Sequence, residues 1–147
     1  MSDSQDWLLF VYKVPSEPTS RRVYVWRKLK RLGAVLLHDA VWVLPTTAYT
    51  REQLQWLAAE INEMSGEALL WESQLLSSTQ SKVIIQQFVA QADAAYSEIL
   101  TEMKTPEADL GALSRRYQQV KAMDYFNSLL EITVRQALMA QGRGATE

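Results

Sequence analysis

The chain has no cysteine among its 147 residues and only one histidine, His38. The missing cysteines exclude disulfide bonds, thiolate metal sites and cysteine nucleophiles, and they fit a reducing compartment. His38 lies beside Asp39, but no spacing nominates a nucleophile that would complete a catalytic triad. The sequence also lacks a glycine-rich phosphate loop and a His-x-x-x-His pair. We therefore expect a protein that is not an enzyme and that carries no metal and no cofactor.

Glycine and proline are scarce, at 5 and 4 residues, whereas 48% of the residues are hydrophobic. This composition predicts a folded chain of the size of one ordinary domain. No apolar run approaches the roughly 20 residues needed to cross a bilayer. The first residues, MSDSQDW, contain no basic stretch of the kind that opens a secretory signal. We expect a soluble, cytoplasmic protein without a membrane partner.

Charge is spread unevenly, because residues 1–31 carry +4 within a chain whose formal net charge is −2. The first predicted helix holds six basic residues and no acidic one: Arg21, Arg22, Arg27, Lys28, Lys30 and Arg31. At helical pitch its apolar stripe consists of Val25, Trp26, Leu29 and Leu32. The charged side chains and Tyr24 fan over the opposite face. This pattern predicts an anion-facing surface, and the alternative is an ordinary solvated face.

The first half of the chain predicts six elements in the order strand, helix, strand, strand, helix, strand. The predicted strands are residues 7–12, 34–37, 41–44 and 68–71. The first helix is capped by Thr19 or Ser20 and ends at Gly33, and the second begins with a capping box at Thr50. This order is that of a ferredoxin-like βαββαβ sandwich of the α+β class, with the first and third strands central. We expect the five tryptophans to pack in the hydrophobic core or at interfaces.

From Ser77 onward the apolar residues recur only at helical spacing, with one break at Thr105-Pro106-Glu107. There we expect Thr105 to cap a second helix and Pro106 to be its first residue. The pattern predicts two long helices in an antiparallel hairpin. We therefore expect a ferredoxin-like domain over residues 1–76 and a helical hairpin over 77–147, packed together as one structural unit.

The last predicted helix carries a possible secondary basic patch made of Arg115, Arg116 and Lys121. These residues could instead pair with nearby acids such as Asp124. We favour ordinary surface pairs, each contributing about 0.2–0.5 kcal/mol.

Several segments resemble the N-terminal domain of the ChrB family of chromate-resistance regulators. The resemblance spans roughly residues 7–137, including LSRRYQQVKAMDYFNS in the last helical region, and its most specific parts are YKVP (12–15), WRKLKRLG (26–33) and VWVLP (41–45). It implies a transcriptional regulator of a chromate-efflux operon that binds DNA through this domain. The sheet layout is also similar to the PaaX regulators and to small CRISPR-adaptation nucleases. Those nucleases carry an acid where this chain has Tyr12-Lys13, which argues against a metal-dependent nuclease.

Three functions follow from these patterns. The favoured one is a homodimer that binds DNA through Arg21, Arg22, Tyr24, Arg27, Lys28, Lys30 and Arg31. The second is a sensor of a small oxyanion such as chromate or sulfate, held by Arg21 and Arg22 near a helix N-terminus. The third is an interaction module whose basic helix docks on an acidic protein partner or on the acidic half of its own chain.

Overall fold

The computed structural model describes residues 4–145 of the chain, which forms two compact units. The first unit ends at Ile84 and the second begins at Ile85, so helix α3 (Ser78–Met103) contributes to both. The predicted boundary after residue 76 falls just before this helix, and the packing of the helical part on the sheet stays a prediction. Within the described residues, no helix is both long and apolar enough to cross a membrane.

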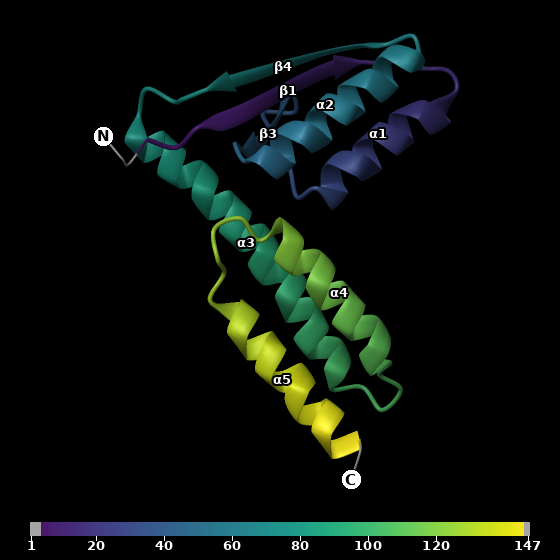
Figure 1. Cartoon of the computed structure of the whole chain (residues 1–147), viewed down its shortest axis with the longest axis vertical. Coiled ribbons are helices and arrows are strands. Elements are labelled where there is room, and N and C mark those ends of the chain that lie inside the picture. Colours follow the sequence, from purple (N-terminus) through teal and green to yellow (C-terminus); the bar gives the residue numbers. More distant parts are fainter. Residues whose placement is uncertain (1–3, 146–147) are drawn as a thin grey trace. The chain divides into compact units, whose positions relative to one another are not determined.

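The first unit contains a four-stranded antiparallel sheet and two helices that lie side by side (Figure 1). Its elements are β1 (Trp7–Lys13), α1 (Thr19–Arg31), β2 (Val35–Leu37), β3 (Val41–Pro45), α2 (Ala48–Glu63) and β4 (Glu67–Ser73). The strand order is β2-β3-β1-β4, and every neighbouring pair is antiparallel. The α+β class, the βαββαβ alternation and the central positions of β1 and β3 are confirmed. The finer assignment to a ferredoxin-like sandwich stays a prediction.

Side chains along a strand alternate between the faces of the sheet, and both faces carry buried residues, since Trp7 and Val43 are buried on the face that Leu9 shares. On β1, Leu8 and Phe10 are buried completely, whereas Leu9 is only half-buried. Their partners on β3 are Leu44 and Trp42, which are also buried. Helices α1 and α2 lie together on one side of the sheet (Figure 1).

Helix α2 is fixed at both ends by contacts that the sequence only partly predicted. Its N-cap is Thr47, whose hydroxyl accepts from the backbone N–H of Thr50, 3.0 Å away. The capping box therefore begins three residues before the predicted one, and Thr50 is a buried member that donates to the carbonyl of Pro45. After α2, Gly66 passes so close to β1 that a Cβ there would collide with the carbonyl oxygen of Lys13.

In the part of the second unit that the structure describes, there are three helical segments, so the predicted two-helix hairpin is wrong. They are the greater part of α3, α4 (Leu110–Met123) and α5 (Leu130–Ala145). The predicted last helix is broken at Asn127, whose φ of 57° lies in the left-handed region. Next to it, the backbone N–H of Ser128 donates to Asp124, and the Ser128 hydroxyl accepts from the backbone N–H of Leu130. These bonds end one helix and start the next.

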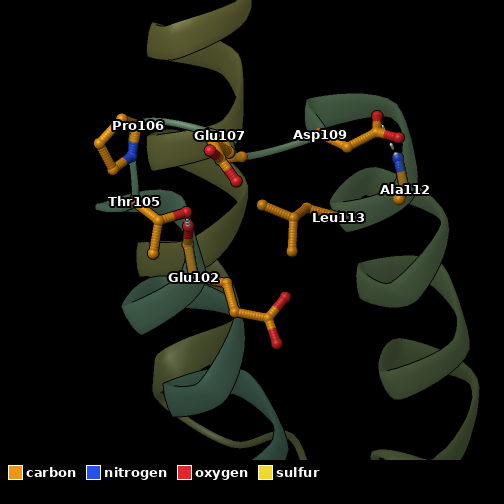
Figure 2. A pocket seen from close by; sticks show the side chains of 8 residues that line it. Glu102, Thr105, Pro106, Glu107, Asp109, Ala112 and Leu113 are labelled. Carbon is orange, nitrogen blue, oxygen red and sulfur yellow. Dashed lines mark hydrogen bonds between the residues drawn. The ribbon is translucent and has the colours of Figure 1, made fainter.

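The turn between α3 and α4 also differs from the prediction, since Thr105 and Pro106 do not begin a helix. Helix α4 starts at Leu110, and its N-cap Asp109 accepts a hydrogen bond of 3.1 Å from the backbone N–H of Ala112. Figure 2 shows this cap beside a pocket of about 460 Å³. The carboxylates of Glu102, Glu107 and Asp109 stand around the pocket, which therefore disfavours anions.

Candidate nucleic-acid interface

Helix α1 is anchored through a narrow apolar stripe. Val25 and Leu29 are completely buried and Leu32 is nearly so. No side chain caps the start of the helix, whose N-cap is Pro18, so the predicted cap at Thr19 or Ser20 is wrong. At the other end Gly33 adopts a φ of 80°, as a left-handed helix stop requires. The rest of the helix surface faces away from the core.

The six basic residues of α1 lie on this outer surface or at its edge. Arg22, Arg27, Lys30 and Arg31 are exposed, and Arg21 and Lys28 are half-buried. Among residues 4–145, none of the six forms an ion pair with a carboxylate. The positive charge of α1 is therefore not neutralised by direct contacts within the described part of the chain, and a polyanion is its natural complement.

Arg21 and Arg22 contact parts of the first unit outside α1. Arg21 donates from Nη1 to the carbonyl oxygen of Met64, at 3.0 Å, and so joins the start of α1 to the end of α2. Arg22 lies near enough to Tyr12 to lower the pKa of that phenol, which burial nevertheless raises above its usual value. Arg21 therefore has a structural role as well as its charge, which leaves fewer of its N–H groups for an anion.

Tyr24 is the one predicted contact residue that bonds a carboxylate. Its hydroxyl donates to Glu60 Oε2 on α2, and this hydrogen bond raises the pKa of Tyr24. Lys28 Nζ lies 5.8 Å from the centroid of the Tyr24 ring. The Tyr24 hydroxyl is therefore already hydrogen-bonded within the protein. It links α1 to α2 and is not a free donor for an external ligand.

Two tryptophans on the helices are exposed, although the sequence predicted core positions for them. Trp26 on α1 has 51% of its surface exposed, and Trp56 on α2 has 65%. Lys30 Nζ lies 5.9 Å from the centroid of the Trp26 ring. Trp56 lies one helical turn before Glu60, on the side of α2 that borders α1. The outer surface therefore combines cations with aromatic rings, the combination that binds phosphates and bases.

The proposed secondary patch is not a uniform basic surface. On α4, Arg116 pairs with Glu98 and Glu102 of α3, each at 2.8 Å. Lys121 lies 3.8 Å from Glu131 of α5. Arg115 is exposed and forms no ion pair with a described residue. Only Arg115 and Lys121 line a common pocket, and Arg116 does not line it.

Comparisons with known proteins agree with the resemblance carried by the sequence motifs. A family described as "Protein ChrB, N-terminal" matches residues 22–119. A curated protein of Cupriavidus metallidurans, "Protein ChrB", is 25% identical over 132 residues, which cover 82% of this chain and 40% of that protein. The chain thus spans less than half the length of this relative. No solved structure matches the chain. Because the family match covers more than half of the chain, including most of α1, the chain belongs to the ChrB N-terminal domain family.

Proposed function

We propose that this chain is a DNA-binding, regulator-like domain linked to chromate resistance, and that it holds DNA through the outer surface of α1. The family membership supports the link to chromate resistance, because the ChrB resemblance implies that setting. The surface of α1 supports DNA as the ligand. The downstream part of a longer ChrB, which this chain does not cover, would carry the response to chromate.

The observation that carries the proposal is the lack of ion pairing on α1. Six cations share one short helix, and no described carboxylate forms an ion pair with any of them. Phosphates of nucleic acid bind such a surface by releasing condensed counterions. Contacts of this kind fix the position of the protein on DNA without reading its sequence.

The exposed aromatic residues add a second kind of contact. Trp26 lies on the same outer surface as Arg27 and Lys30, so its ring can stack on an exposed base or sugar while the cations hold phosphates. The Tyr24 hydroxyl contributes indirectly, by holding α1 against α2. We further propose that two copies act together, because a dimer doubles the number of phosphate contacts.

The test is charge reversal of Arg27, Lys28 and Arg31 to glutamate, followed by a gel shift with a duplex from upstream of the protein's own coding sequence. These residues make no ion pair with a described carboxylate, so the fold should survive. We expect affinity to fall more than about 100-fold, since three cations become three anions at a phosphate-facing surface.

A matched control changes a cation that is paired in the protein. Arg116→Gln removes one charge from α4, where Glu98 and Glu102 already neutralise it. We expect its affinity for DNA to stay within about twofold of the unchanged protein. Unchanged binding by the triple variant, with a native circular dichroism spectrum, would refute DNA binding through α1.

A further inference from the structure

The second unit contains a pocket of about 460 Å³ between α4 and α5 that no part of the proposed function uses. It is lined by residues of both helices, including Arg115, Tyr117, Lys121, Arg135, Leu138 and Met139. The volume is in the range of sites for small organic ligands. Besides the neutral polar Ser114 and Gln118, the lining consists of a cationic group and an apolar group.

The cationic side of the pocket is held in place by one carboxylate outside its lining. Glu131 Oε1 accepts from the Tyr117 hydroxyl at 2.6 Å and lies 3.2 Å from Arg135 Nε and 3.8 Å from Lys121 Nζ. These contacts lower the pKa of Glu131, with the Tyr117 hydrogen bond as the main cause, and they keep the carboxylate charged. Glu131 therefore holds the side chains of Lys121 and Arg135 in place through one of its oxygens.

The charge around the pocket remains positive after this pairing. Arg115, Lys121 and Arg135 contribute three cations, whereas Glu131 and Asp124, which line the adjoining pocket with Lys121 and Arg135, contribute two negative charges. Among the described residues, Arg115 has no ion-pair partner, and Arg135 lies 3.2 Å from Glu131 through its Nε. The free guanidinium N–H groups can therefore donate in pairs to a carboxylate, sulfonate or phosphate.

The apolar side of the pocket lies against these donors. Tyr117 lines this side although it is almost completely buried, with Lys121 Nζ 6.0 Å from its ring centroid, while Leu138 is half-buried and Met139 is 55% exposed. An exposed methionine beside an aromatic ring is a deformable apolar surface that suits a planar or aliphatic group. Inorganic sulfate or phosphate would leave this apolar surface exposed to water. The pocket therefore favours an anion that also has an apolar body.

We propose that the groove between α4 and α5 binds a small organic anion with an aromatic or aliphatic body. Its acidic group would lie between Arg115 and Arg135, and its apolar body would lie on Tyr117, Leu138 and Met139. The inference does not rest on DNA binding by α1. The pocket at the α3–α4 turn, of equal volume but walled by Glu102, Glu107 and Asp109, provides an internal contrast that repels the same ligand (Figure 2).

The test uses 8-anilinonaphthalene-1-sulfonate as the probe and the full chain labelled with ¹⁵N for two-dimensional NMR. We expect saturable amide shifts over residues 114–121 and 135–139, with a dissociation constant on the order of 0.1 mM. Arg115→Gln removes a cation that has no ion-pair partner in the described chain, and should weaken binding about tenfold without affecting the fold. Arg135→Gln should weaken it at least as much.

Lys104→Gln is the matched control, because Lys104 is an exposed cation of the same unit that does not line the pocket. It should leave the dissociation constant unchanged. The proposal fails if the shifts map elsewhere, if Arg115→Gln binds the probe as tightly as the unchanged protein, or if sodium sulfate produces the same shifts at the same concentration. It also fails if Arg115→Gln weakens DNA binding instead, since the groove would then be a phosphate contact.

Discussion

The outer surface of α1 and the surface formed by α4 and α5 contain similar numbers of cations but differ in what surrounds them. On α1, no described carboxylate forms an ion pair with the basic side chains. On the second surface, Lys121 and Arg135 pair with Glu131, and Arg115 has no ion-pair partner among the described residues. Arg116 of α4 pairs with Glu98 and Glu102 of α3 instead. A count of basic residues cannot separate the two surfaces, whereas the pairing can. We therefore assign a polyanion to the first and a small anion to the second.

The largest expected effect separates the buried and exposed faces of α1. Leu29→Ala should lower the free energy of unfolding by about 2–5 kcal/mol, because it leaves a cavity at a fully buried position. Trp26→Ala, three residues earlier and half exposed, should lower it by less, about 1 kcal/mol. Urea denaturation of both variants measures the difference. A large loss from Trp26→Ala would mean that this tryptophan is covered in solution.

The second prediction concerns a variant in which a cation of α1 gains a carboxylate partner, as several cations of α4 and α5 have. Val23 is exposed, and Val23→Glu places a carboxylate one turn before Arg27, where the two side chains pair along the helix. We expect DNA affinity to fall about tenfold, because one cation is neutralised at a phosphate-binding surface. Fluorescence anisotropy with a labelled duplex measures it. Val23→Gln is the control and should bind within about twofold of the unchanged protein; equal loss in both would assign the effect to shape.

The third prediction concerns the hydrogen bond from Tyr117 to Glu131, which joins α4 to α5. Tyr117→Phe should lower the free energy of unfolding by about 1 kcal/mol, because it removes the bond to Glu131. Burial and this bond raise the pKa of Tyr117 to about 12. A group whose pKa is raised by folding stabilises the protein below its unfolded pKa of about 10 and loses that effect as pH rises further.

The difference between the unchanged protein and Tyr117→Phe should therefore shrink between about pH 10 and pH 12. It should also shrink in acid, because Glu131 has a lowered pKa and stabilises the fold only while it is charged. Denaturation curves at pH 3, 7 and 11 measure both changes. A difference that stays constant across this range would show that the bond does not contribute.

The smallest effect is expected from freeing a paired cation. Glu98→Gln combined with Glu102→Gln leaves Arg116 without its two carboxylates. Exposed pairs of this kind contribute little, so the loss of stability should be below about 1 kcal/mol. DNA affinity should rise less than about threefold, because a single extra cation lies outside the α1 surface. A rise above about tenfold would place α4 within the DNA interface.

The periodicity of α1 was sufficient to predict its buried stripe but not the orientation of its tryptophan. Val25 and Leu29 recur at helical spacing and are buried as predicted. Trp26 follows Val25 directly and so lies about 100° around the helix from it, at the edge of the stripe. Its hydrophobic character suggested burial, while its position favoured exposure. The same conflict applies to Trp56, which precedes the buried Leu57.

The break between α4 and α5 could have been predicted from residue types, since Asp124, Asn127 and Ser128 are residues that turn and cap chains. The apolar spacing across this segment suggested one continuous helix instead. The pairing of Arg116 could not have been predicted, because Glu98 and Glu102 lie 18 and 14 residues away and meet it only in the folded unit. Pairing across helices is a property of the tertiary fold, and it is the property that separates the two basic surfaces.

The salt dependence of DNA binding tests the central claim most directly. The dissociation constant of the unchanged protein and of Arg27→Glu/Lys28→Glu/Arg31→Glu would be measured with one duplex between 50 and 300 mM salt. A log–log slope steeper than about −3 is expected for the unchanged protein, and a slope shallower by about 0.9 for each lost phosphate contact in the variant. Equal slopes in the two proteins would contradict the account, since the cations of α1 would then not contact phosphate.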